Sequence, residues 1–223
     1  MVAGARPGAR AHPAEGRRKV EGVAPLAAAA SARRSLAAAR PVDMDQGWVA
    51  LLRGINVGGK NIVPMADLRR LFEESGCSCV STYIQSGNVI FRHPTKARLE
   101  LAQLLEQAVA DTFGVPAVVV LRTFEEVAKV ARSHPFGTDT SQTVVTFLAR
   151  KPDREGVRRL AKPDVTPDQF KVVGSDVFLH YPNGVRGARL TGTLLERHLG
   201  IPGTARNWRT VTRLADMAEA AAQ

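Results

Sequence analysis

The order of hydrophobic patterns between Trp48 and Thr123 limits the possible folds more than any other feature of this sequence. Strand-like runs and helical stripes alternate there, with turn residues between them. The pattern predicts a strand at 49–52, a helix that Pro64 opens and Gly76 closes, strands at 80–85 and 88–92 around a Ser-Gly turn, a helix through 101–113, and a strand at 116–122. This βαββαβ order is that of a ferredoxin-like plait, whose sheet is antiparallel.

The rest of the chain partly repeats this pattern after a linking segment. Thr123 and Glu126 have the spacing of a capping box, which begins a helix that Pro135 ends. A strand at 143–149 and a helix at 153–161 follow, and FKVVGSDVFLHY at 170–181 repeats the strand, turn and strand of YIQSGNVIF at 83–91. A leucine-rich helix and a terminal helix capped by Asn207 complete the pattern. We therefore expect an α+β protein with two ferredoxin-like halves, at 47–123 and 142–223, joined by a helix and loop at 124–141.

Four blocks of the sequence resemble one bacterial family. The blocks are LLRGINVGGKN at 51–61, YIQSGNVIF at 83–91, YPNG at 181–184 and TARNW at 204–208. They are similar to the family catalogued as domain of unknown function number 1697, and the resemblance covers residues 48–214. It implies the two-half fold and no particular reaction. After YPNG the family usually reads GRSKLT, whereas this chain reads VRGARLT. Ala188 stands where the family usually has a serine, which puts a role for a hydroxyl group there in doubt. Arg189 stands where the family usually has a lysine, so the cation is kept.

The first 43 residues differ in composition from the rest of the chain. They are rich in Ala, Arg, Gly and Pro, and such a segment cannot bury enough apolar surface to offset the entropy of ordering it. We expect a disordered extension that the fold does not need. An upstream start codon, with Met44 as the true first residue, is the interpretation we favour over an export signal or an organelle transit peptide.

The formal charge of +10 divides equally between this extension and the rest of the chain. Residues 1–43 hold eight basic and three acidic groups, so residues 44–223 hold 23 and 18, and that remainder is only mildly basic. Two cysteines, Cys77 and Cys79, favour a reducing compartment and are too few for a structural zinc site. No apolar run approaches the roughly 20 residues that span a bilayer. We expect a cytoplasmic protein without membrane contact, metal or cofactor.

The loop GINVGGKN at 54–61 is the first candidate for ligand binding. It fits G-x-x-x-x-G-K, but Asn61 stands where a P-loop has its magnesium-binding hydroxyl, and Pro64 starts the helix too late, so we expect no ATP or GTP hydrolysis. The loop still suits an anion. A plain strand-to-helix connection whose glycines supply positive φ is the alternative. The candidate groups are the N–H groups of Gly58 and Gly59, the cations Arg53 and Lys60, and the amides of Asn56 and Asn61.

Polar residues near other turns extend this candidate site. We predict that Arg53, Lys60, Arg189 and Arg206 include the cations of one anion site. His180 is the only candidate proton carrier, and a surface histidine without that role is the alternative. The further candidate ligand-binding residues are Gln85, Asn88 and Asn207.

Three functions remain open at this point. The first is a module that binds a phosphorylated ligand or a nucleic-acid backbone. The second is an enzyme that acts on such a ligand with His180 as acid or base, and the third is an interaction protein without a ligand. Sequence-specific RNA recognition by the sheet is disfavoured, because the chain is only 5% aromatic and NVIFR at 88–92 lacks the double-aromatic pattern.

Overall fold

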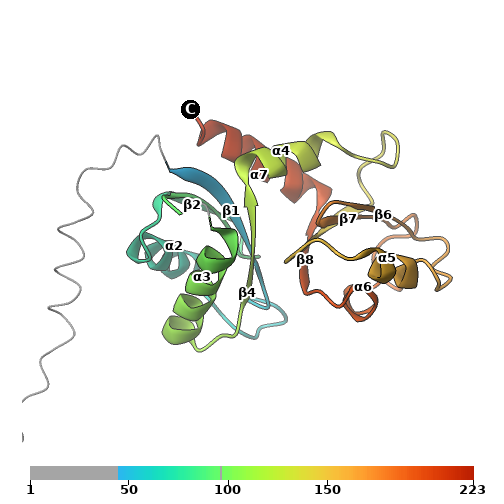
Figure 1. The fold of residues 1–223 in the computed structure, drawn as a ribbon, viewed down its shortest axis with the longest axis horizontal. Coiled ribbons are helices and arrows are strands. Elements are labelled where there is room, and N and C mark those ends of the chain that lie inside the picture. The colour runs from blue at the N-terminus through green and yellow to red at the C-terminus, as the bar shows by residue number, and fades with distance from the viewer. Residues whose placement is uncertain (1–44, 96) are drawn as a thin grey trace, which may run out of the picture. The chain divides into compact units, whose positions relative to one another are not determined.

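The computed structural model describes residues 45–95 and 97–223, so the expectations for residues 1–43 and for Met44 lie outside the described part. The first half forms a four-stranded antiparallel sheet in the order β2-β3-β1-β4 (Figure 1). Its elements are β1 (Gln46–Arg53), α2 (Met65–Glu74), β2 (Ser78–Tyr83), β3 (Asn88–His93), α3 (Arg98–Phe113) and β4 (Val118–Thr123).

The second half repeats this arrangement with the same connectivity. Its sheet has the order β6-β7-β5-β8, in which each strand takes the place of its counterpart in the first sheet, and all pairs are antiparallel. The elements are β5 (Thr143–Leu148), α5 (Arg154–Leu160), β6 (Gln169–Val173), β7 (Asp176–His180), α6 (Gly192–Leu199) and β8 (Gly203–Asn207). The predicted α+β fold with two ferredoxin-like halves is confirmed.

Each half ends in an additional helix. The helix α4 (Phe124–Arg132) follows β4, and α7 (Trp208–Ala220) follows β8. The predicted capping box is present at α4, where the Thr123 hydroxyl accepts from the Glu126 N–H and the Glu126 carboxylate accepts from the Thr123 N–H. Asn207 caps α7 as predicted, because its side chain accepts from the Thr210 N–H at 2.8 Å. Corresponding helices therefore begin directly after corresponding strands.

Three apolar clusters form the core. Strand side chains alternate between faces, so β1 gives Ala50 and Leu52 to the cluster under α2 and α3, and gives Val49 and Leu51 to a shared cluster. A third cluster joins the second sheet to α5 and α6. The shared cluster combines both sheets with α4 and α7, and includes Val120, Val127, Val130, Phe147, Phe178, Trp208, Val211 and Leu214. One face of each sheet is thus covered by its own helices, and the other lies against the shared core.

The turn of the first hairpin begins earlier than predicted. Residues 80–85 were expected to be a strand, but β2 ends at Tyr83 and residues 84–87 form the turn. Ile84 has φ of 48°, a left-handed conformation that interrupts a strand. Gln85 therefore lies in the turn and is exposed.

Candidate functional site

Side-chain amides hold the loop at 54–63 in one conformation. Asn56 donates from Nδ2 to the carbonyls of Val63 and Gln85, each at 2.9 Å, and its Oδ1 accepts from the Val63 N–H at 2.8 Å. Asn61 donates from Nδ2 to the Gly54 carbonyl at 2.7 Å. Both candidate amides are thus engaged in bracing the loop, and the bond to Gln85 ties the loop to the first hairpin turn.

The tip of this loop is a tight turn. The Lys60 N–H donates to the Val57 carbonyl at 3.0 Å, and the two residues pair as an isolated bridge. Between them, Gly58 and Gly59 have φ of 57° and 73°, and a Cβ on either would meet no atom within 4 Å. Glycine is needed here for its backbone freedom rather than for close packing. In the described part of the chain, the N–H groups of Gly58 and Gly59 donate to no residue, and Lys60 is exposed.

Arg206 is buried at the junction of the two halves, with an exposed fraction of 7%. Its five N–H groups all have acceptors inside the protein. The acceptors are the Asn88 Oδ1, the Thr204 Oγ1 and the carbonyls of Leu52, Ser86 and Ala205. These acceptors include no carboxylate, and burial lowers the pKa of the guanidinium to about 10. Arg206 therefore fastens β8 to the first half, and in this arrangement it has no N–H left for a ligand.

Asn88 is the partner of Arg206 on the first half. It is fully buried, and its Nδ2 donates to the Tyr83 carbonyl and the Ser86 Oγ, both at 2.9 Å. Its Oδ1 accepts from Arg206. The Nδ2 of Asn88 thus stabilises the hairpin turn, and its Oδ1 binds Arg206. Four predicted residues, Asn56, Gln85, Asn88 and Arg206, consequently lie in one corner of the molecule, where most of their polar atoms bind each other or the backbone.

A second buried arginine, Arg122, makes the reciprocal contact. It lies on β4 of the first half with an exposed fraction of 2%, and reaches the β6–β7 turn of the second half. Its Nε and one terminal nitrogen donate to Asp176 Oδ1 at 3.1 and 2.8 Å, and the same terminal nitrogen donates to the carbonyls of Leu148 and Ser175. The guanidinium carbon lies 5.6 Å from the centre of the Phe147 ring. Burial raises the pKa of the Asp176 carboxyl, and Arg122 opposes that rise.

The strand registers show that the two arginines are equivalent. Arg122 pairs with Val49 in the first sheet, and Arg206 pairs with Val145 in the second. Their partners are equivalent too, since Asn88 pairs with Leu51 as Asp176 pairs with Phe147. Each half therefore sends an arginine from its fourth strand into the hairpin turn of the other. Our sequence interpretation missed Arg122, although LRTF at 121–124 and ARNW at 205–208 share an arginine, a capping residue and an aromatic in the same order.

The other two predicted cations make separate contacts. Arg53 extends from the end of β1 to α6, where it pairs with Glu196 at 2.6 Å, and both side chains are about two-fifths exposed at 39% and 42%. The Arg189 side chain pairs with Asp164 at 3.0 Å, and its N–H donates to Asp168. The hydrogen bonds of Arg53 and Arg189 therefore do not join them to the network around Arg206.

His180 lies at the end of β7 and packs on Phe136, with ring centres 5.5 Å apart. Its Nδ1 is buried and has no hydrogen-bond partner among the described residues. The neighbouring Tyr181 is buried, its hydroxyl donates to the Leu190 carbonyl at 2.9 Å, and burial raises its pKa to about 12. Tyr181 therefore supports the loop before α6.

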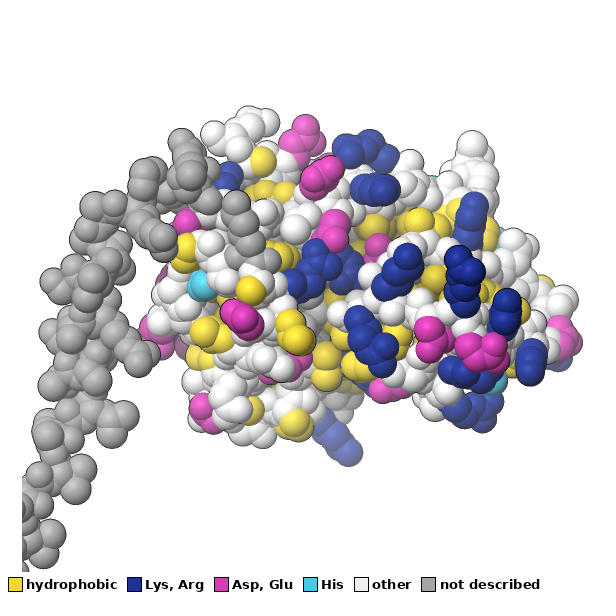
Figure 2. Space-filling view, viewed as in Figure 1, with side chains coloured by type: hydrophobic (Ala, Val, Ile, Leu, Met, Phe, Trp, Pro, Cys, Tyr) yellow, Lys and Arg dark blue, Asp and Glu magenta, His cyan; other side chains and the backbone are white. Residues whose placement is uncertain are grey.

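Basic side chains gather on the second half. Residues 44–141 hold ten basic and ten acidic groups, whereas residues 142–223 hold thirteen and eight. Figure 2 shows Lys and Arg side chains spread over α5 and the segments beside it. We call this surface the basic face. The name stands for the basic residues of α5 and of the segments that flank it in the sequence, which are Arg150, Lys151, Arg154, Arg158, Arg159 and Lys162.

Some other kinds of site find no support in the described residues. Among residues 45–95 and 97–223, no three His, Cys, Asp or Glu side chains gather as ligands for one metal ion. Within the same ranges, no helix is long and apolar enough to cross a bilayer.

Comparisons with known proteins agree with the fold. A family model described as protein of unknown function (DUF1697) matches residues 45–178. The solved structure of conserved bacterial protein SP0830 from Streptococcus pneumoniae is similar, with a TM-score of 0.64 and 23% identity over 78% of this chain and 99% of that one. No curated protein shows a significant match to the chain. At that identity, the structural likeness extends to the fold alone.

Proposed function

Because this chain belongs to the family of unknown function DUF1697, which supplies no activity to adopt, we propose from its own geometry that it binds the phosphate backbone of nucleic acids through the basic face. The observation that carries the proposal is the charge asymmetry between the halves. Residues 44–141 are neutral by count, and residues 142–223 carry the whole positive excess of residues 44–223. Backbone phosphates are the polyanion that such a surface attracts most generally.

The charges of the basic face remain available to a partner. Five of its six residues are exposed, and Arg159 is half-buried. Within the described residues, its single ion pair is the loose contact of Arg158 with Glu155 at 3.7 Å. Arg150 and Arg159 donate to the carbonyls of Gly200 and His198 in and beside α6, which positions their guanidinium groups without neutralising them.

The proposed binding is independent of base sequence. Ferredoxin-like domains that read single-stranded RNA stack bases on the open face of the sheet. Here that face of each sheet lies in the shared core, where Val49, Phe147 and Phe178 are essentially buried. The sheets therefore offer no surface on which bases could stack. A basic surface on a helix contacts the phosphates of the backbone rather than the base edges, so its binding does not depend on base sequence.

Salt-dependent binding tests the proposal. The full chain is titrated against fluorescein-labelled single- and double-stranded oligonucleotides, and binding is measured by fluorescence anisotropy. If about four phosphates are neutralised, affinity should fall roughly 100-fold between 50 and 200 mM salt. The same affinity for oligonucleotides of unrelated sequence is expected.

A matched pair of variants locates the surface. Arg154→Glu with Arg158→Glu reverses two charges on the basic face, and should weaken binding while lowering the salt slope by about two. Arg69→Glu with Arg70→Glu reverses two exposed arginines on α2 and serves as the control. Equal weakening by both pairs, or no binding at 50 mM salt, would refute the proposal.

A small phosphorylated ligand at the 57–60 turn is the second candidate. It is favoured by the N–H groups of Gly58 and Gly59, which bind no residue in the described chain, beside the exposed Lys60. Binding of inorganic pyrophosphate that depends weakly on salt and is lost in Lys60→Ala would support this function in place of the first.

A further inference from the structure

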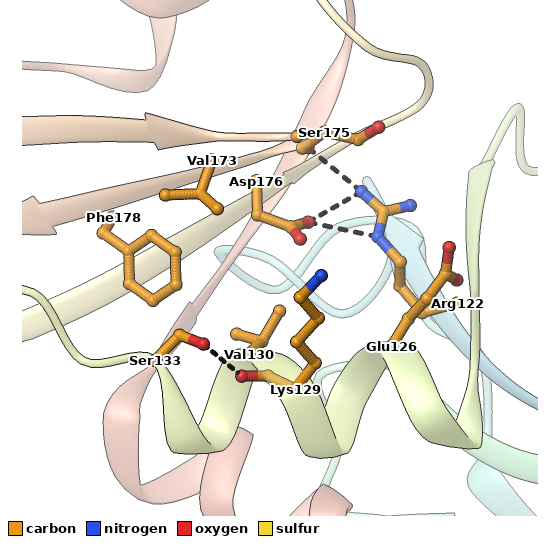
Figure 3. A pocket seen from close by; sticks show the side chains of 10 residues that line it. Arg122, Glu126, Lys129, Val130, Ser133, Val173, Ser175, Asp176 and Phe178 are labelled. Atoms are coloured by element: carbon orange, nitrogen blue, oxygen red, sulfur yellow. Dashed lines mark hydrogen bonds and ion pairs between the residues drawn. The ribbon is translucent and has the colours of Figure 1, made fainter.

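A second site of different chemistry lies between α4 and the β6–β7 turn. A pocket of about 240 Å³ opens there, bounded by the helix on one side and the hairpin on the other (Figure 3). That volume corresponds to about eight water molecules at roughly 30 Å³ each. The pocket suits a small molecule, and it is too small for a polymer segment.

Two carboxylates line this pocket, and each has a free oxygen. Asp176 Oδ1 accepts twice from Arg122, whereas its Oδ2 has no hydrogen-bond partner among the described residues. Glu126 Oε2 accepts from Arg98 and from the Thr123 N–H, and its Oε1 has no such partner in the same part of the chain. Each carboxylate raises the free energy of charging the other, as the effect of Glu126 on the pKa of Asp176 shows. Arg122 lies between the two carboxylates and already opposes that effect (Figure 3), and a ligand cation at Asp176 Oδ2 would oppose it further.

A cation lies on the same pocket. The Lys129 side chain extends from α4 into the opening on the side of Asp176 (Figure 3), and within the described residues it forms no ion pair within 4 Å. Lys129 follows Glu126 by three residues, so the two side chains leave the same face of α4. The pocket therefore presents an ammonium and free carboxylate oxygens within one small space.

Three apolar side chains form part of the remaining wall, and Ser133, Gly174 and Ser175 complete it. Val130 and Phe178 are buried at 5% and 1% exposure, and they form the inner surface. Val173, at the end of β6, is 38% exposed beside them. An apolar group of a ligand placed against these three side chains would bury the exposed part of Val173. That burial would contribute favourable hydrophobic free energy to binding.

We propose that this pocket binds a free α-amino acid with an apolar side chain. The ammonium group of the ligand binds Asp176 Oδ2, and its carboxylate binds Lys129. The side chain packs against Val130, Val173 and Phe178. The four charged side chains that line the pocket are Arg122, Glu126, Lys129 and Asp176, and their formal charges sum to zero, which matches a zwitterion better than a polyanion. The proposal is thus independent of nucleic-acid binding at the basic face.

Calorimetric titration of the full chain with L-leucine tests the assignment. Two analogues each lack one charge: 3-methylbutylamine has no carboxylate, and N-acetyl-L-leucine has no ammonium. Each should bind roughly tenfold or more weakly than L-leucine, because each loses a charged hydrogen bond. The L-leucine amide should behave as the amine does.

Lys129→Gln locates the site, since this exposed residue can change without disturbing the core. It should weaken L-leucine binding by roughly tenfold or more, whereas Lys162→Gln, an exposed lysine on the basic face, should leave it unchanged. Absence of binding at about 10 mM L-leucine, which is tenfold above a dissociation constant of about 1 mM, would overturn the proposal. Equal binding of an analogue or of Lys129→Gln would overturn it as well.

Discussion

Replacing the two reciprocal arginines one at a time should destabilise the protein in two different ways. Arg206→Met leaves the Asn88 Oδ1 and the Ser86 carbonyl without their donor in the junction, and it weakens the contacts of the Leu52 carbonyl. Each buried acceptor left unsatisfied costs about 1–3 kcal/mol. Methionine also removes a buried charge that has no carboxylate partner, which offsets part of that loss. We therefore expect a fall of about 3 kcal/mol in the free energy of unfolding.

Arg122→Met differs because it leaves a charge behind. Asp176 loses its guanidinium partner while 13% of its side chain is exposed, and breaking such a buried pair costs about 3–5 kcal/mol when the carboxylate is ionised. Burial already raises the pKa of Asp176, and loss of Arg122 removes the opposing effect. The folded variant can therefore avoid the penalty by protonating Asp176.

The pH dependence follows from this difference. A carboxyl whose pKa is higher in the folded than in the unfolded state binds more protons when folded, so stability falls as pH rises through the two pKa values. The loss caused by Arg122→Met should thus be smaller at pH about 5 than at pH about 8. The loss caused by Arg206→Met should be nearly the same at both, because it leaves only neutral acceptors.

Urea unfolding followed by tryptophan fluorescence measures both losses, since Trp208 lies in the shared core. Far-ultraviolet circular dichroism should give the same transition if unfolding is two-state. A loss below about 1 kcal/mol for Arg206→Met would show that the junction does not depend on its hydrogen bonds. An Arg122→Met loss that is equal at both pH values would contradict the role assigned to Asp176.

Three further changes test other parts of the fold by the same unfolding assay. Asn88→Asp should cost about 1 kcal/mol, because the carboxylate accepts from Arg206 but cannot donate to the hairpin turn, and a gain in stability would contradict that account. Gly87→Ala should cost more than Gly58→Ala: both have positive φ, but a Cβ at 87 would lie 2.7 Å from a side-chain carbon of Ile55, whereas one at 58 meets nothing. Thr123→Ala should cost about 1 kcal/mol by removing the α4 cap, and no loss would show that Glu126 alone secures the helix start.

The sequence predicts the fold well because local patterns determine it. Strand alternation, helical stripes and turn residues each depend on neighbours a few positions apart, and the two βαββαβ orders can be read directly from them. The cap residues Thr123 and Asn207 were found in the same way. The end of β2 was missed, since no local pattern indicates that Ile84 takes a left-handed conformation.

The role of the polar residues could not be predicted in this way. Asn88 and Arg206 are 118 positions apart, and nothing near either residue shows that they meet. Donors in a glycine-rich loop look alike whether they face a ligand or a carbonyl of the same chain, and the structure gives Asn56 and Asn61 internal acceptors. Arg122 stands in a buried strand pattern, so only its equivalence with Arg206 could have drawn attention to it.

The shared core has a consequence for biosynthesis. Domains generally fold as units while the chain leaves the ribosome, with the N-terminal one first. The first sheet can pair as soon as β4 has emerged, but part of the cover for its second face comes from Trp208, Val211 and Leu214 in the last helix. Until α7 has been synthesised, the side chains of Val49, Leu51 and Ile90 remain partly exposed to solvent on the nascent chain. Helix α7 thus completes the cover of a surface whose strands are synthesised well before it.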